Sequence, residues 1–130
     1  MNANDITANA TWLDIIPAIP LTRGTPYLAI NGSRGIVLRA GGDPRLVVVR
    51  RDGCSRVHNA YLTAIRADID DPQGFGYALR YLLAHPDRHW LNTARHEILR
   101  GQLAIIRWAE GKTTDADRIA LARALAELVS

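Results

Sequence analysis

The chain has 130 residues, of which 48% are hydrophobic and 22% are charged. These values are typical of one folded domain that buries a core without cross-links, and they exclude a wholly disordered chain. The net charge is +3, and arginine accounts for all but one of the 16 basic residues.

The cysteine count and the hydropathy pattern limit the compartment. Cys54 is the only cysteine, so no disulfide can form within the chain and a reducing compartment is expected. Residues 1–11 contain no basic residue and no apolar run of signal-peptide length, and no stretch of about 18 uncharged apolar residues occurs. We therefore expect a single domain over residues 1–130, located in the cytoplasm and making no contact with a membrane.

Positive charge is concentrated in one third of the chain. Residues 23–66 carry a net charge of +6, whereas residues 1–22 carry −2 and residues 67–130 carry −1. A high-GC coding bias is the simplest explanation of the preference for arginine over lysine. The uneven distribution is more informative, because a coherent basic surface attracts anionic partners.

Residues 1–25 form an irregular N-terminal segment in our prediction. Apolar residues such as Trp12 and Ile16 indicate burial, but Pro17 and Pro20 prevent a continuous helix. A short helix or strand near residues 11–16, followed by an extended segment, is the arrangement that this pattern favours.

A basic, strand-rich region follows over residues 26–66. Asn31 and Gly32 predict a type I′ hairpin turn between its first two strands. The next connection is a longer turn, because residues 40–44 are rich in Gly, Asp and Pro. Residues 56–67 fit either a fourth strand or a helix, and periodicity does not decide between them. The three clearest β-forming runs span residues 27–30, 35–39 and 45–50.

The helical part of the chain spans residues 71–129. Asp71 predicts an N-cap, with Pro72 at the first helical position. Gly74 and Gly76 weaken the first turns of this helix, because glycine is a poor helix former. His85, which precedes a proline, marks its end.

Two further helices complete the predicted fold. One runs over about residues 87–110 and stops at Gly111. The last begins at a capping box of Thr114 and Asp117 and ends near residue 129. The chain is therefore predicted to be an α+β protein, in which an N-terminal antiparallel meander of three or four strands packs against three C-terminal helices.

The helix over residues 87–110 has two apolar sides, which is typical of a central helix or of half an oligomer interface. Leu99, Leu103 and Ile106 form the second apolar ridge and are the candidate surface for a homodimer or a protein partner. The remaining polar sector carries His96, Arg100 and Arg107, a secondary basic row.

The histidines and the cysteine do not form a recognisable reactive site. His85 and His89 are four residues apart, but Pro86 disturbs the helical pairing that a zinc site needs, and His96 lies two turns further on. Cys54 and His58 resemble a nucleophile and its base only in spacing, and no activating environment accompanies them.

Acidic residues offer one weak candidate for a metal site. Asp68, Asp70 and Asp71 cluster in a predicted loop, where oxygen ligands can collect a hard cation. An acidic turn that caps the following helix explains the cluster more simply. We therefore predict no catalytic residue, no metal and no cofactor.

The basic sheet is the strongest functional signal in the sequence. Arginine on outward strand positions can contact phosphates, and we predict a small non-enzymatic binding or regulatory protein whose partner is an anionic macromolecule, nucleic acid first. An adaptor or inhibitor that binds another protein through an apolar helix face, and a small enzyme with a His/Asp site, are the alternatives. The predicted anion contacts are Arg34, Arg39, Arg45, Arg50, Arg51 and Arg56.

Overall fold

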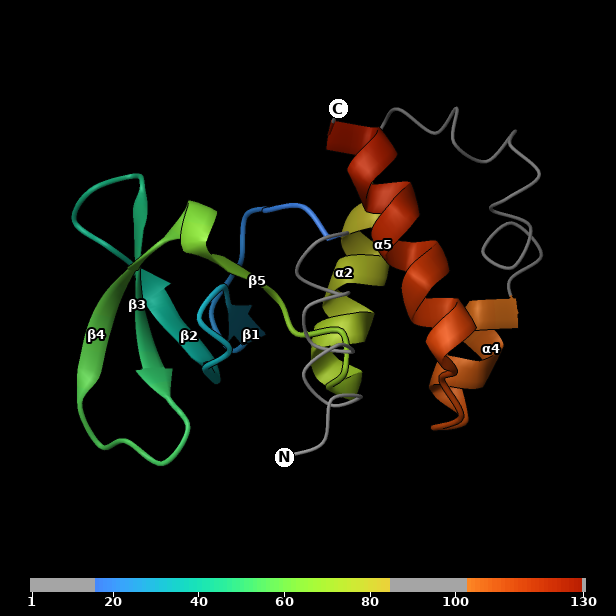
Figure 1. The fold of residues 1–130 in the computed structure, drawn as a ribbon, viewed down its shortest axis with the longest axis horizontal. Helices are drawn as coiled ribbons and strands as arrows, with labels where there is room; N and C mark the ends of the chain where they lie inside the picture. Colours follow the sequence, from blue (N-terminus) through green and yellow to red (C-terminus); the bar gives the residue numbers. More distant parts are fainter. Residues whose placement is uncertain (1–15, 85–102, 130) are drawn as a thin grey trace.

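Five antiparallel strands in the N-terminal half are followed by three helices in the computed structural model, which describes residues 16–84 and 103–129 (Figure 1). The chain has the predicted α+β fold. The strands are β1 (Pro26–Ala29), β2 (Arg34–Ala40), β3 (Leu46–Arg51), β4 (Val57–Tyr61) and β5 (Ile65–Ala67). The three helices are α2 (Pro72–Ala84), α4 (Leu103–Ala109) and α5 (Asp115–Val129), and a single 3-10 turn, η1 (Leu62–Ala64), lies between β4 and β5.

The strand order across the sheet is β4-β3-β2-β1-β5. Strands β1 to β4 form a meander, and β5 returns to pair with β1, so that β4 and β5 are the two edges. Residues 56–67, which periodicity left open, form two strands separated by the 3-10 turn. The meander therefore has four strands, and a fifth strand that the sequence did not indicate completes the sheet.

The turn between β1 and β2 differs from the predicted type I′ turn. The Ala29 N–H donates to the Ser33 carbonyl at 2.8 Å, and the Gly32 N–H donates to the Ala29 carbonyl at 2.9 Å. These bonds enclose a loop of three residues that ends in Gly32, which has a positive φ of 88°. A three-residue loop ending in a left-handed glycine is the next most common hairpin connection. Asn31 contributes through its side chain, which accepts the Ser33 N–H at 3.0 Å.

A register shift in β2 decides which side chains share a face of the sheet. Val37 pairs with Val49, but the next pair joins Arg39 to Val48, so Leu38 is the extra residue of a bulge. Because directly paired residues point to the same side, the bulge moves Arg39 to the face opposite Val37. Without the bulge, strict alternation would place Arg39 on the same side as Val37.

The two faces of the sheet have different compositions. We call the face that carries Tyr27, Val37 and Val49 the concave face, because residues from both sheet edges line a common pocket there. We call the opposite one the outward face. From the strand register, the outward face carries Ile36, Arg39, Val48, Arg50, Val57 and Asn59.

The helix ends follow the predicted local signals. The Asp71 carboxylate accepts the Gln73 N–H at 2.8 Å and caps α2. Thr114 and Asp117 form a reciprocal capping box at α5, with N–H to side-chain oxygen distances of 3.0 and 3.2 Å. Gly111 has φ 72° and follows α4, where its N–H donates to the Trp108 carbonyl. Local sequence therefore determined all three of these termini.

Gly74 and Gly76 have a structural role that the prediction of weakened helical turns missed. Both are buried in α2. A Cβ at Gly74 would overlap the backbone of Asp68, and a Cβ at Gly76 would overlap the indole ring of Trp108. The glycines therefore allow a loop and α4 to approach the helix closely.

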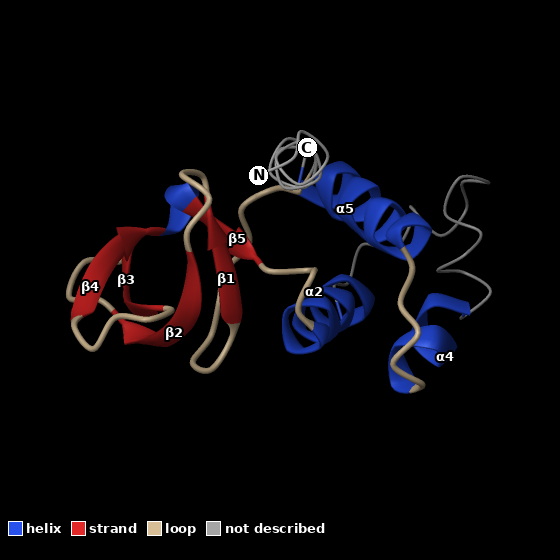
Figure 2. Cartoon of the chain, turned by 60° about the horizontal axis from the view of Figure 1, so that its bottom comes forward, coloured by secondary structure: helices blue, strands red, loops and turns tan. Residues whose placement is uncertain are grey.

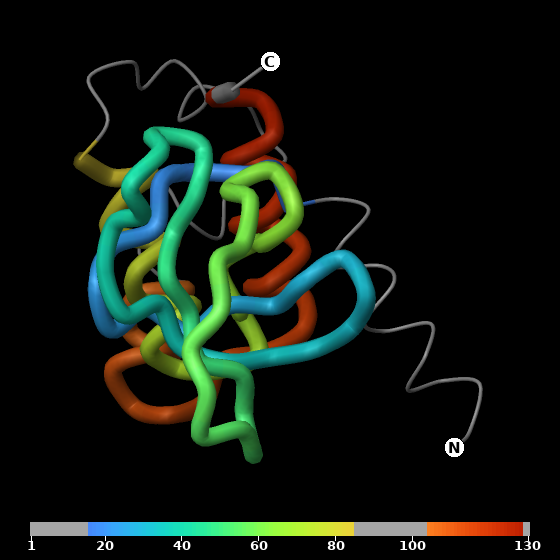
Figure 3. The backbone as a smooth tube through the Cα atoms, turned by 90° about the vertical axis from the view of Figure 1, so that its left-hand side faces the viewer, coloured from blue at the N-terminus to red at the C-terminus, as the bar shows by residue number. Residues whose placement is uncertain are grey.

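One buried cluster joins the sheet to the helices. It includes Val37 and Ile65 from the sheet, Phe75 and Leu82 from α2, and Leu121 from α5. The helices lie beside the β1–β5 end of the sheet, where α2 contacts both strands (Figure 2). Viewed from the sheet side, the hairpins lie in front and the helices behind them (Figure 3).

The extended segment before β1 also packs into this cluster. Ile16, Ile19 and Leu21 are buried, although residues 17–22 have no regular secondary structure. Arg66 donates from Nε to the Ile16 carbonyl at 3.1 Å and fixes the start of the segment. The element predicted near residues 11–16 lies almost entirely outside the described residues.

Candidate functional site

The outward face of the sheet displays two unpaired arginines. Arg39 and Arg50 are exposed, and no ion pair joins either of them to a carboxylate within residues 16–84 and 103–129. Val48 in β3 lies between Arg39 of β2 and Asn59 of β4 and is only 8% exposed. The long arginine side chain can therefore cover apolar sheet surface while its guanidinium reaches solvent.

Arg51 and Arg56 lie close in sequence to this face but not on it. Arg51 follows Arg50 in β3 and therefore points to the concave face, where it pairs across the sheet with Gly35. Arg56 lies in the connection between β3 and β4. Both are exposed, and neither forms an ion pair with a described carboxylate. Four of the six predicted contact arginines are thus unpaired, but they surround one end of the sheet rather than sharing one face.

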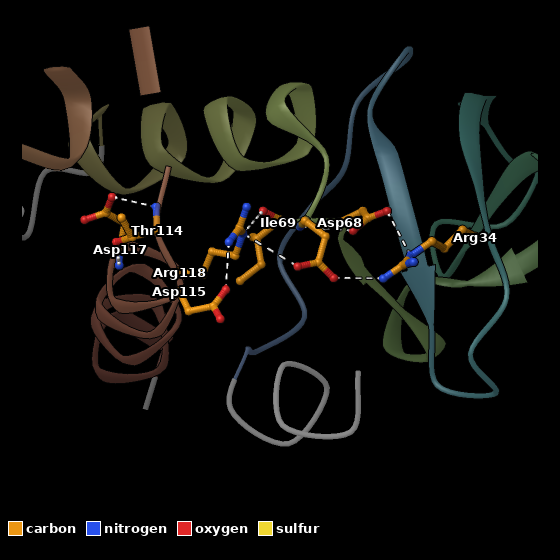
Figure 4. A network of polar contacts seen from close by, with 8 residues as sticks. Arg34, Asp68, Ile69, Thr114, Asp115, Asp117 and Arg118 are labelled. Atoms are coloured by element: carbon orange, nitrogen blue, oxygen red, sulfur yellow. Dashed lines mark hydrogen bonds and ion pairs between the residues drawn. The ribbon is translucent and has the colours of Figure 1, made fainter. Parts of the chain in front are cut away.

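Arg34 forms ion pairs with two aspartates of the protein itself. Its Nη2 donates to Asp70 Oδ2 at 2.8 Å, and its Nε lies 3.2 Å from Asp68 Oδ2 (Figure 4). Asp68 is buried, and this burial raises the pKa of its carboxyl group, against the opposing effect of Arg34. An arginine that compensates a buried carboxylate is poorly placed to bind an external anion.

The acidic cluster after β5 connects the sheet to α5. The Arg118 side chain donates from Nε to the Ile69 carbonyl at 3.2 Å and lies 3.6 Å from Asp70 Oδ1. Its Nη1 also donates to Asp115 at 2.8 Å, so one polar network runs from β2 to the last helix (Figure 4). Within the described part of the chain, no group of three or more His, Cys, Asp or Glu side chains is arranged to hold a metal ion.

Arg45 is also paired, but on the surface. Its Nη2 donates to Asp43 Oδ2 at 2.8 Å, and its backbone N–H donates to the other carboxylate oxygen at the same distance. The Arg45 side-chain hydrogen bonds hold the pKa of Asp43 below its usual value. Because both groups reach solvent, the pair can open at little cost.

The secondary basic row is described only at Arg107. This arginine forms a two-pronged ion pair with Asp117, and its Nε lies 2.7 Å from Asp117 Oδ2. The hydrogen bond from Arg107 holds the pKa of the fully buried Asp117 below its usual value. Arg107 therefore joins α4 to the capping box of α5. His96 and Arg100 lie outside the described residues.

Of the apolar ridge predicted as an interface, the structure describes the side chain of one residue, Ile106. Ile106 is 50% exposed on α4. Leu99 and the side chain of Leu103 lie outside the described residues, so the extent of the ridge stays a prediction.

Cys54 and His58 come closer together than their sequence spacing indicated. Cys54 Sγ lies 3.6 Å from His58 Nε2 across the β3–β4 connection. The thiol is part-exposed and the imidazole is exposed.

A pocket of about 460 Å³ opens on the concave face, and sequence reasoning did not find it. Val49, Ala60 and Ile65 contribute apolar lining, and Arg51 and His58 contribute basic groups. The sheet must curl to bring β4 and β5 to one cavity, and no local sequence pattern reports this curvature.

Comparisons with protein-family models, curated proteins and solved structures find no match to this chain. Among the helices of the described residues, none has the length and apolar character required to span a bilayer.

Proposed function

We propose that this protein binds nucleic acid through the unpaired arginines at the β2–β3–β4 end of the sheet. The observation that carries the proposal is that aspartates near α5 form ion pairs with arginines, whereas, within the described part of the chain, the arginines at the far end of the sheet do not. Asp68, Asp70, Asp115 and Asp117 all lie within ion-pairing distance of arginines in the network around α5. The arginines at the far end of the sheet have no such partners among the described residues.

Exposed guanidinium groups with no internal role retain their hydration and their full attraction for anions. Arg39 and Arg50 are free to make bidentate contacts with phosphate oxygens. Such contacts are independent of base sequence, and each one releases condensed counterions. A non-enzymatic binding or regulatory role is consistent with this surface.

The test is the salt dependence of binding to fluorescein-labelled DNA, followed by fluorescence anisotropy. For a duplex probe the logarithm of the association constant should fall against the logarithm of the salt concentration, with a slope of about −0.9 for each phosphate contacted. Arg39→Gln and Arg50→Gln should each make this slope shallower by about one contact. Arg123→Gln is the matched control, because it removes an arginine that is also exposed but lies on α5.

The proposal fails if neither DNA nor RNA of mixed sequence binds in a salt-dependent manner. It also fails if the two sheet substitutions change the slope no more than the Arg123→Gln control does. A complex that tolerates high salt would point instead to a protein partner that uses apolar contacts.

A further inference from the structure

The unpaired arginines surround an edge of the sheet, and this arrangement limits the shape of the partner. Arg50 and Arg51 are consecutive in β3 and therefore point to opposite faces. Arg39 shares the outward face with Arg50, and Arg56 lies in the connection that leads from β3 into the edge strand β4. A partner that contacts all four must pass around this edge.

A duplex and a single strand differ in their ability to follow such a path. Double-stranded DNA has a persistence length of about 150 base pairs, so over one small protein it behaves as a nearly straight rod. A sheet with its side chains is only about 10 Å thick, so the turn from one face to the other around β4 is tight. A duplex can therefore lie on one face at a time, whereas a single strand has the backbone flexibility to bend over the edge.

A nucleic-acid strand that bends over this edge would reach the concave pocket. Val49 and Ala60 line it with apolar surface, and Arg51 and His58 line it with basic groups. Its volume of about 460 Å³ lies within the range of small-ligand sites. Apolar lining beside a guanidinium is complementary to the flat ring and the phosphate of a nucleotide.

We propose that the partner is a single-stranded nucleic acid that crosses the β4 edge and inserts one unpaired base into the concave pocket, with a phosphate at Arg51. This inference rests on the proposed function and narrows it. Arg39 and Arg50 then hold the backbone on the outward face, and Arg56 contacts it at the crossing.

The first experiment compares one labelled single-stranded oligodeoxynucleotide of mixed sequence with its own duplex, using the full chain. The single strand should bind about tenfold more tightly at equal salt. Arg51→Gln should make the salt slope for the single strand shallower by about 0.7, and it should leave the slope for the duplex unchanged. Arg50→Gln should affect both probes, because the outward face is accessible to both.

The outcomes separate the two proposals. If the duplex binds as tightly as the single strand with a steep salt slope, or if Arg51→Gln weakens both probes equally, the single-strand inference is overturned and the proposed function is retained. If neither probe binds, both are overturned.

The second experiment tests the pocket with a free mononucleotide. Adding AMP to isotope-labelled protein should shift the methyl signals of Val49 and the ring signals of His58 in NMR spectra. Perturbations confined to the outward face, at Val48 and Val57, would overturn the placement of the base. Shifts at Val49 with AMP but no preference for single strands would show a nucleotide site unconnected to strand binding, and would also overturn the inference.

Discussion

Replacing Gly76 by alanine should destabilise the protein, although alanine is the better helix former. Gly76 lies in the interior of α2 and is buried. A methyl group there would overlap Trp108 Cζ2 and lie 2.8 Å from Cε2. The indole cannot easily withdraw, because its Nε1 donates a hydrogen bond to the Pro72 carbonyl at 2.8 Å.

The magnitude follows from two opposing contributions. Alanine in place of glycine within a helix stabilises by about 1 kcal/mol. Overpacking of a tight contact costs about 1–3 kcal/mol, and a clash with two atoms of a rigid ring belongs at the upper end. We therefore expect Gly76→Ala to lower the free energy of unfolding by about 1–2 kcal/mol, and to lower Tm by roughly 4–8 °C.

Urea unfolding followed by far-UV circular dichroism measures this change, and a double-mutant cycle with Trp108→Ala isolates its cause. In the Trp108→Ala background the overlap is gone, so Gly76→Ala should become neutral or stabilising. Gly42→Ala is the control, because an added Cβ at that loop position meets no atom within 4 Å. The reasoning is refuted if Gly76→Ala stabilises the native background, or if its effect is the same with and without the indole.

Four further outcomes follow from the packing and from the buried aspartates. Leu82→Ala, at a fully buried position, should cost about 2–5 kcal/mol in urea unfolding, whereas Ile106→Ala, which is half exposed, should cost well under half as much. Thr114→Ala removes the side-chain half of a capping box and should cost about 1 kcal/mol, with Thr114→Ser restoring most of it; equal losses in both variants would argue against capping. The pKa of Asp117 is lowered, so its stabilising contribution is present above its unfolded value of about 3.9 and is lost as the pH falls through the lower folded value; Asp117→Asn should reduce stability near neutral pH and flatten the acid limb of a stability–pH curve. The pKa of Asp68 is raised, so the opposite sign applies, and this group adds stability as the pH falls through its raised folded value. Asp68→Asn should remove that gain from the stability–pH curve. An unchanged pH dependence in Asp68→Asn would contradict this expectation.

The location of charge was only partly predictable. The sequence placed excess arginine in the sheet region, and the unpaired Arg39, Arg50, Arg51 and Arg56 lie there. It did not reveal that Arg34 compensates carboxylates that follow β5. The sequence separation is 34 residues or more, so only the pairing of β1 with both β2 and β5 brings these groups together.

The sequence by itself determined the features that depend on residues a few positions apart. The cap at Asp71, the box at Thr114 and the stop at Gly111 each arise from hydrogen bonds within about one helical turn, so the residue types suffice to predict them.

Tertiary structure alone decided the features that depend on distant contacts. The bulge at Leu38, which turns Arg39 outward, exists only in the register of β2 against β3. The close approach at Gly76 needs Trp108 from another helix, and the concave pocket needs the sheet to curl. Each of these features depends on how two elements pack together. The sequence pattern of one segment does not show which distant segment will pack against it.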